Sequence, residues 1–151
     1  MKRVSPLLLL AVLLVSGCGS GRLSDSEYRG RISNVNVDLT NAASAISGTA
    51  SPRTSILRIR ASLGRLADSQ DRIAGVVEGL KPPKRAEAAN ALLAKGARDF
   101  AKEIRATQQT MGSYSSHAKA VALLRKNLSD PKGVQELSRA FAQLHRLGYF
   151  M

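Results

Sequence analysis

The sequence predicts an all-α protein, an antiparallel up-down bundle of three to five helices, and three observations support this fold class. The composition is rich in Ala, Leu and Arg with only 4% aromatic residues in 151, a bias that favours helix over sheet. Apolar residues recur three or four positions apart along most of the chain, and no segment alternates with the period of a strand. The connections between the periodic segments are short, which makes consecutive helices antiparallel neighbours.

A short apolar segment precedes the helical pattern. Lys2 and Arg3 give it a positive start, and residues 7–15 form an unbroken run of nine apolar residues. A helix that spans a bilayer needs about 20 such residues, so this run is too short to be a span. It is typical of a secretory signal peptide, and we expect residues 1–17 to be removed.

The end of this segment resembles the lipobox of bacterial lipoproteins. Val15-Ser16-Gly17-Cys18 supplies an aliphatic residue, two small residues and the only cysteine of the chain. The resemblance implies cleavage before Cys18, a diacylglycerol in thioether linkage to its sulfur, and often an acyl chain on the new amino terminus. More than one acyl chain on a residue anchors a protein stably without a spanning helix. The alternative is an ordinary signal peptide cut nearby, with Cys18 incidental.

The same resemblance implies a location on the cell membrane, with the protein anchored by lipid and facing outward. In a host with one membrane, the anchor would stay on the outer leaflet. In a host with two membranes, the protein would face the periplasm or lie at the outer membrane. Gly19 favours the outer membrane there, because the familiar inner-membrane retention signal is an Asp at that place.

Residues 18–25 are predicted to form a flexible tether, and residues 26–149 the helical domain. The tether opens with small residues that favour a flexible coil. The first helix is expected to begin at a cap from Ser24 or Ser26 and to end before Gly48 and Ser51-Pro52. Its apolar face consists of Tyr28, Ile32, Val35, Leu39, Ala42, Ala43 and Ile46.

The second helix shows a heptad pattern and is expected to end at Lys81-Pro82-Pro83, where Pro83 can also begin the next helix. A seam with this repeat packs two helices side by side. Gln70 is its single polar member, which either fixes the register of the helices or lines a small cavity. The seam positions are Ile56, Ile59, Leu63, Leu66, Gln70, Ile73, Val77 and Leu80.

Two more periodic segments follow. Residues 112–116 favour a kink or a short break over an unbroken helix, and Asp130-Pro131 marks a definite boundary. Residues 148–151 are expected to form a tail. The third helix carries Leu93, Ala97, Phe100, Ile104, Thr107 and Met111 on one face, and the last carries Val134, Leu137, Phe141 and Leu144.

The turn Leu80-Lys81-Pro82-Pro83 and the later Leu147-Gly148-Tyr149 resemble a helical hairpin seen in many small uncharacterised bacterial lipoproteins. This resemblance covers residues 55–149 and implies a helical bundle. It implies no catalytic residue. The chain departs from the pattern at Asn90, which stands near the place where those proteins often carry a His.

The sequence predicts no catalytic residue, no metal site and no cofactor other than the lipid on Cys18. One cysteine and two separate histidines, His117 and His145, fall short of the several converging ligands of a metal site. We therefore expect that the protein is not an enzyme.

The acidic and glycine residues inside the helices are expected to be structural. Candidate acid pairs have basic neighbours at helical spacing, which favours solvated intrahelical ion pairs. Helix glycines without the spacing of a phosphate loop are expected at close packing contacts. These are Asp68 with Arg65 and Arg72, Asp99 with Lys95 and Lys102, and Gly64, Gly75, Gly79 and Gly96.

The basic excess suggests a partner. The net charge is +12, and losing Lys2 and Arg3 with the signal would lower it to +10. Because the predicted signal implies export, nucleic acid is excluded as the main partner. The polyanions available outside the cytoplasm are anionic lipids, wall polymers and acidic envelope proteins. The alternative is that the basic residues only keep the bundle soluble. The residues expected at an anionic surface are Arg58, Arg65, Arg72, Lys81, Lys84 and Arg85.

Two functions are compatible with these features. The first is a lipid-anchored extracytoplasmic bundle that acts as a scaffold or interaction module of the cell envelope. The alternative is a carrier that binds a lipid or small hydrophobic ligand in a groove between helices. Small residues in the third helix, with Met111 and Tyr114 near its end, suggest the carrier.

Overall fold

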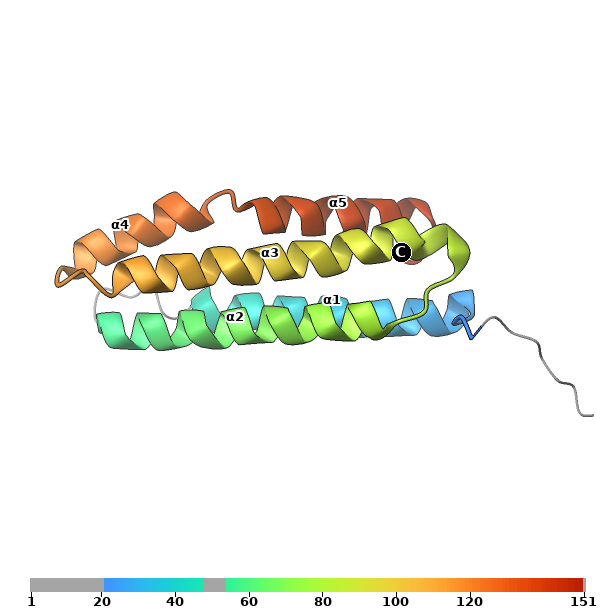
Figure 1. Ribbon diagram of the computed structural model, residues 1–151, viewed down its shortest axis with the longest axis horizontal. Coiled ribbons are helices and arrows are strands. Elements are labelled where there is room, and N and C mark those ends of the chain that lie inside the picture. The colour runs from blue at the N-terminus through green and yellow to red at the C-terminus, as the bar shows by residue number, and fades with distance from the viewer. Residues whose placement is uncertain (1–20, 48–53, 151) are drawn as a thin grey trace, which may run out of the picture.

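The computed structural model describes residues 21–47 and 54–150, which form helices joined by short connections (Figure 1). This described part of the chain contains no strand, so the all-helical fold class is confirmed. In chain order the elements are α1 (Asp25–Ser47), α2 (Ile56–Gly79), the 3-10 turn η2 (Lys84–Ala86), α3 (Glu87–Met111), α4 (His117–Leu128) and α5 (Lys132–Arg146).

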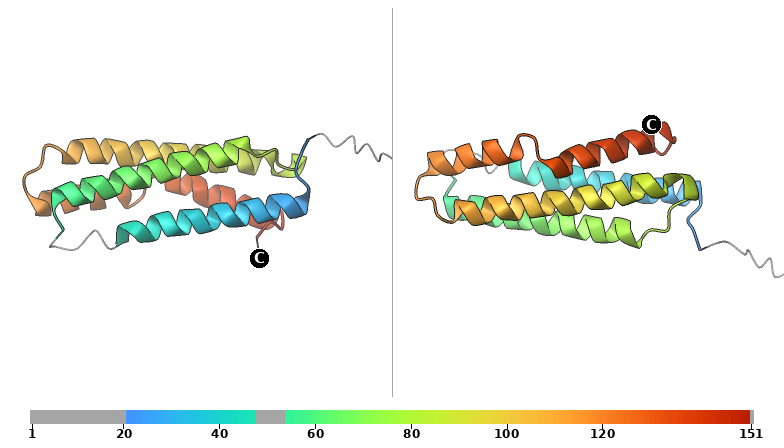
Figure 2. Two further views of the ribbon diagram at one scale, coloured as in Figure 1. Left: turned by 90° about the horizontal axis from the view of Figure 1, so that it is seen from below. Right: turned by 45° about the horizontal axis from the view of Figure 1, so that its top comes forward.

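The helices lie side by side along the long axis and form a bundle (Figures 1 and 2). The chain reverses direction from α1 to α2, from α2 to α3, and again from α3 to α4. Helix α5 then continues in the direction of α4. The two shorter helices therefore share the fourth position of the bundle, next to α3.

Helix α1 begins with a capping box. The Ser24 hydroxyl accepts the Glu27 backbone N–H at 3.3 Å, and Glu27 Oε2 accepts the Ser24 backbone N–H at 2.8 Å. Of the two predicted caps, the structure uses Ser24. The predicted end signals of this helix, Gly48 and Ser51-Pro52, lie outside the described residues.

The heptad seam of α2 faces the core, where α2 packs on α3 and on α1. The predicted seam is half-buried only at its two ends, Ile56 and Leu80, and is buried between them. Gln70 is 2% exposed and lies between two apolar clusters, one that includes Ile73 and one that includes Leu66. Its Oε1 has no hydrogen-bond partner among the described residues.

The two predicted interruptions have different roles in the fold. Residues 112–116 separate α3 from α4, so the predicted break is confirmed, and the chain reverses there (Figure 1). Asp130-Pro131 is a boundary as predicted, but α4 and α5 keep one direction across it. The sequence indicated a kink or break at residues 112–116 but not that the chain reverses there.

Two glycines allow α3 and α5 to pack closely. A Cβ atom at Gly96 would lie 2.8 Å from the Leu137 backbone nitrogen. A Cβ atom at Gly133 would overlap the backbone of Phe100. The backbones of the two helices therefore approach each other more closely than side chains would permit.

The other helix glycines divide into two kinds. A Cβ atom at Gly64 would lie 2.9 Å from Gln108 Nε2, whereas Gly75 and Gly79 face open space. The packing prediction is confirmed at Gly64 and Gly96 and is wrong at Gly75 and Gly79. Sequence spacing alone did not distinguish them, because it does not show where a neighbouring helix lies.

Candidate functional site

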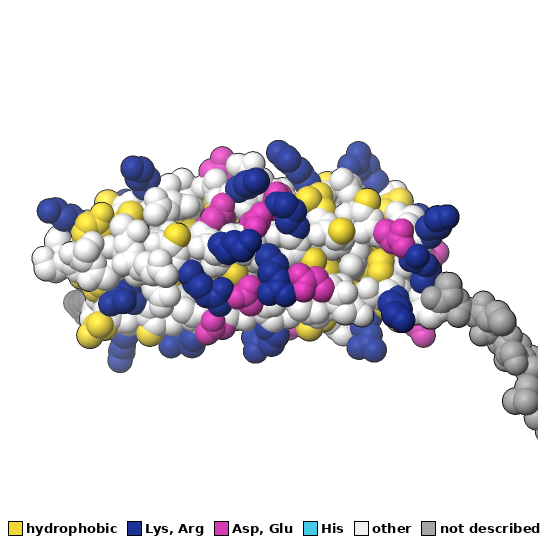
Figure 3. Space-filling model, in the orientation of Figure 1, with side chains coloured by type: hydrophobic (Ala, Val, Ile, Leu, Met, Phe, Trp, Pro, Cys, Tyr) yellow, Lys and Arg dark blue, Asp and Glu magenta, His cyan; other side chains and the backbone are white. Residues whose placement is uncertain are grey.

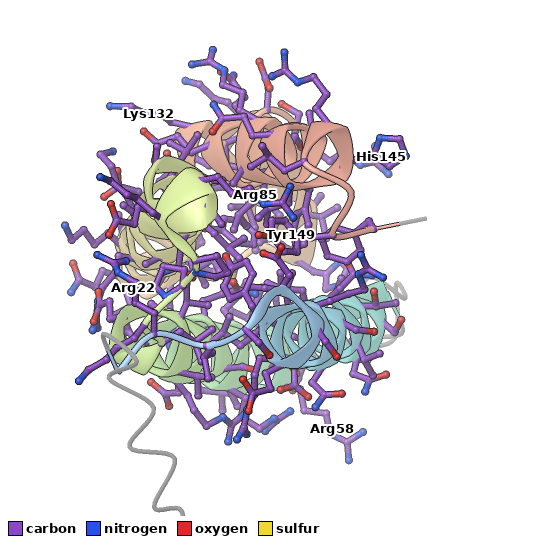
Figure 4. All side chains as sticks on the ribbon, turned by 90° about the vertical axis from the view of Figure 1, so that its right-hand side faces the viewer. Arg22, Arg58, Arg85, Lys132, His145 and Tyr149 are labelled. Atoms are coloured by element: carbon purple, nitrogen blue, oxygen red, sulfur yellow. The ribbon has the colours of Figure 1, made fainter. Side chains whose placement is uncertain are left out.

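Three of the six basic residues predicted at an anionic surface follow one side of α2. Arg58, Arg65 and Arg72 are exposed, and none is ion-paired to another described residue. Arg65 Nη2 donates to Ser62 Oγ at 2.8 Å, and Arg72 Nη2 donates to Ser69 Oγ at 3.2 Å. Figure 4 shows Arg58 pointing away from the bundle. These three guanidinium groups, here named the α2 stripe, present their charge to solvent.

The other three predicted residues lie beyond the opposite end of α2. Lys81 and Lys84 are exposed and make no ion pair within the described chain. Arg85 Nη2 is paired with Asp25 Oδ2 at 2.6 Å. The 24 residues of α2 span about 36 Å, so the structure does not bring all six residues together. We name Lys81 and Lys84 the turn cluster.

Arg85 belongs to a network with Asp25 and Tyr149. The Tyr149 hydroxyl donates to Asp25 Oδ1 at 2.5 Å and accepts a hydrogen bond from Arg85 Nε at 3.0 Å. The Arg85 guanidinium carbon also lies 5.1 Å from the centre of the Tyr149 ring. The hydrogen bond from Tyr149 is the chief cause that lowers the pKa of Asp25, and burial raises the pKa of Tyr149. The charge of Arg85 is therefore balanced within the protein.

Tyr149 lies in the core, where sequence reasoning placed a tail. Gly148 adopts a φ of +80°, the left-handed conformation that favours glycine and ends α5 in a Schellman motif. In this motif the Tyr149 N–H donates to the Leu144 carbonyl at 3.0 Å. The turn directs Tyr149 back onto Tyr28, with their ring centres 5.0 Å apart. The available signal was Gly148, two residues after the last helical residue, Arg146.

Asn90 is a second residue whose contacts sequence reasoning missed. Its Oδ1 accepts the Tyr28 hydroxyl proton at 3.1 Å, and its Nδ2 donates to the Val77 carbonyl at 3.0 Å. The side chain therefore links α1, α2 and α3 inside the core. Burial is the main cause that raises the pKa of Tyr28, so its hydroxyl stays a neutral donor.

The first described residues are attached to the turn that carries the turn cluster. The Leu23 N–H donates to the Lys81 carbonyl at 2.8 Å, and Arg22 Nη1 donates to the Pro82 carbonyl at 3.0 Å. Arg22 is also ion-paired with Glu87. The later part of the predicted tether, residues 18–25, therefore lies on the bundle. Figures 1 and 4 show that the described chain begins at this end.

The basic residues of α3 differ from the α2 stripe, because each of them is ion-paired. Two bridge to α2, and Figure 3 shows the mixed charge on this face. The predicted pairing of Asp99 is confirmed, whereas Asp68 pairs with Arg105 of the neighbouring helix and not with the basic residues of its own. The pairs are Lys95 with Asp99 and Glu136, Arg98 with Asp71 and Glu78, Lys102 with Asp99, and Arg105 with Asp68 and Asp71.

The residues that suggested a carrier pack in the core. Met111 is fully buried, and Tyr114 is half-buried against the same apolar cluster. Most of the residues that line an open pocket of about 590 Å³ beside α3 are polar or charged. This lining consists of Glu78, Asn90, Ala91, Ala94, Lys95, Arg98, Asp99 and Lys102.

The predicted lipidation site, Cys18, lies outside the described residues together with the rest of the lipobox. Within residues 21–47 and 54–150, none of the helices has both the length and the apolar character of a membrane span. The same residues include no group of three His, Cys, Asp or Glu side chains placed to hold a metal ion. Comparisons with protein-family models, curated proteins and solved structures found no match for this chain.

Proposed function

We propose that this protein is a lipid-anchored, outward-facing helical bundle that acts as a scaffold or interaction module of the cell envelope. Residues 15–18, with their lipobox-like pattern, support the anchor. The main support for the proposal is that the chain joins the bundle only a few residues after Cys18. Gly21 lies three positions after Cys18, and a Cβ atom at Gly21 would lie 3.5 Å from Lys81 Nζ. An acyl chain on Cys18 would hold this end of the bundle near the membrane.

The charge distribution supports an interaction role. The α2 stripe and the turn cluster make no ion pairs within the described chain, whereas the basic residues of α3 are neutralised by nearby acids. Exposed positive charge of this kind attracts polyanions over several ångströms. Anionic lipids, wall polymers and acidic envelope proteins are the partners that fit it.

Replacing the cysteine tests the anchor. Cys18→Ser removes the thiol that would carry the diacylglycerol. We expect the variant to lose incorporation of a labelled fatty acid, and to move to the soluble fraction or remain unprocessed. Ser16→Ala is the matched control, because it keeps a small residue in the lipobox and should remain acylated. Continued acylation of the Cys18→Ser chain would contradict the proposal.

A further inference from the structure

An open pocket of about 380 Å³ lies where the chain joins the bundle. It is formed by three segments that are distant in sequence: the first described residues, helix α1, and the end of α2 with the following turn. Figure 4 views this end of the molecule. The pocket is lined by Gly21, Leu23, Arg31, Gly79, Leu80 and Lys81.

The two basic side chains of the pocket make no ion pair within the described chain. Arg31 lies one helical turn after Glu27, whose carboxylate accepts hydrogen bonds from the Ser24 hydroxyl at 2.7 Å and from the Ser24 backbone N–H. These hydrogen bonds are the chief cause that lowers the pKa of Glu27, and the charge of Arg31 lowers it further without forming an ion pair. The Lys81 backbone carbonyl accepts the Leu23 N–H, and the Lys81 ammonium group makes no hydrogen bond or ion pair with another described residue. The pocket therefore holds two cations with no acid among its lining residues.

The rest of the lining is apolar or open. Leu23 and Leu80 are half-buried and supply apolar surface beside the two cations. Gly79 has nothing within 4 Å of its Cβ position, so it leaves space at the rim. Gly21 has a φ of +62°, a conformation that favours glycine and brings the chain against Lys81. An anionic group attached to an apolar body fits such a pocket.

The position of the pocket identifies the source of that anion. Gly21 lies three positions after Cys18, and a chain of three residue steps spans at most about 11 Å. The field of an anionic membrane extends about 8 Å at physiological ionic strength. A pocket next to the anchored residue thus lies within reach of the headgroups, whereas Arg58 lies at the far end of α2.

We propose that this pocket binds the phosphate of an anionic phospholipid in the membrane to which Cys18 is anchored, with Arg31 and Lys81 as the phosphate ligands and Leu23 and Leu80 against its apolar part. This inference rests on the proposed lipid anchor. It makes the anchored end the docking surface, and it leaves the α2 stripe free of the membrane.

Amine labelling of the full acylated chain in lipid nanodiscs tests the pocket. Lys81 is the reporter, and Lys119, near the start of α4 at the opposite end of the bundle, is the internal control (Figure 1). We expect Lys81 to react at least about fivefold more slowly in discs with anionic phospholipid than in neutral discs, the ratio that corresponds to one basic residue held at an anionic surface. Lys119 should react equally in both.

Variants of matched charge test the assignment to this pocket. Arg31→Gln should remove most of the protection of Lys81 in anionic discs, because it removes the other phosphate ligand. Arg58→Gln has the same loss of charge at the far end of α2 and should leave the protection unchanged. Circular dichroism of both variants checks that the helices are retained.

The outcomes separate the pocket from the anchor. A chain that elutes apart from the discs overturns the anchor, and the pocket proposal with it. A chain that stays with the discs while Lys81 reacts equally in anionic and neutral lipid overturns the pocket alone. Equal protection of Lys81 and Lys119 also overturns it, because this indicates that the bundle lies flat. Protection by inorganic phosphate in neutral discs would identify free phosphate as the ligand and overturn the lipid assignment.

Discussion

Asn90 and Tyr149 hold one end of the bundle together through side-chain contacts between residues that are far apart in sequence. Asn90 hydrogen-bonds to Tyr28, which lies 62 positions before it, and to Val77, which lies 13 positions before it. Tyr149 hydrogen-bonds to Asp25, which lies 124 positions before it. Periodicity predicted that Tyr28 and Val77 are buried. It did not predict the polar partners, because a repeat indicates which face of a helix is buried and not which residue of another helix it meets.

The Asn90 contacts give the first prediction. Asn90→Ala leaves the buried Tyr28 hydroxyl without an acceptor, so we expect the free energy of unfolding to fall by about 1–3 kcal/mol in urea denaturation. The double variant Tyr28→Phe with Asn90→Leu removes both polar groups and should cost less than the sum of the two single variants. An Asn90→Ala chain as stable as the wild type would contradict the role of this hydrogen bond.

Helix α5 is held in place by its contacts with α3. Gly96 and Gly133 place the two backbones close together, and the Glu103 carboxylate accepts the N–H groups of Lys132 and Gly133 at 3.0 and 3.1 Å. These bonds satisfy donors at the start of α5 and place a negative charge at its positive end. The sequence predicted close packing at Gly96, but the opposing glycine and the cap from another helix required the tertiary structure.

Two glycine-to-alanine substitutions test the close contact between α3 and α5. Gly133→Ala would place a methyl group on the Phe100 backbone, and we expect it to lower the free energy of unfolding by about 1–3 kcal/mol as α5 is displaced. Gly75→Ala has open space around its methyl group and should raise the free energy by about 0.5–1 kcal/mol, because alanine favours helix. Thermal and urea unfolding of the two variants would measure this difference. Equal effects of the two would show that the α3–α5 contact is looser than described.

Across the whole molecule, the acidic residues are concentrated where helices meet, and much of the positive charge is left exposed. Arg98 and Arg105 join α3 to carboxylates of α2, and Lys95 joins it to Glu136 of α5. The hydrogen bond from Arg98 lowers the pKa of Glu78, and that from Lys95 lowers the pKa of Asp99. The acids therefore stabilise the bundle while the α2 stripe and turn cluster remain unpaired.

These lowered pKa values predict a pH dependence of stability. The pKa values of Asp25, Glu78 and Asp99 in the folded protein lie below their ordinary values of 3.8, 4.5 and 3.8, so the unfolded chain binds protons first as the pH falls. The stabilisation is complete above about pH 5 and is lost as the pH falls through the folded-state values. The thermal midpoint followed by circular dichroism should be constant from neutral pH to about pH 5 and then fall.

A variant pair checks the source of this dependence. Glu78→Gln should show a shallower decrease in the thermal midpoint below pH 5, because it removes one carboxylate with a lowered pKa. Asp38→Asn replaces an exposed carboxylate that makes no hydrogen bond or ion pair within the described chain, and its decrease should parallel that of the wild type. Parallel curves for both variants would exclude the Glu78–Arg98 pair as a contributor.

The sequence by itself determined the helical class, the buried seam of α2 and the boundaries around residues 112–116 and 130–131. These features depend on residues a few positions apart, and their signals are local: apolar spacing, capping side chains, Gly and Pro. Only the tertiary structure decided that Asp68 pairs with Arg105, that Arg85 is neutralised, and that Arg31 and Lys81 share a pocket at the start of the bundle. Such contacts depend on how the helices are placed against one another, because the register and distance between two helices are set by packing across their interface.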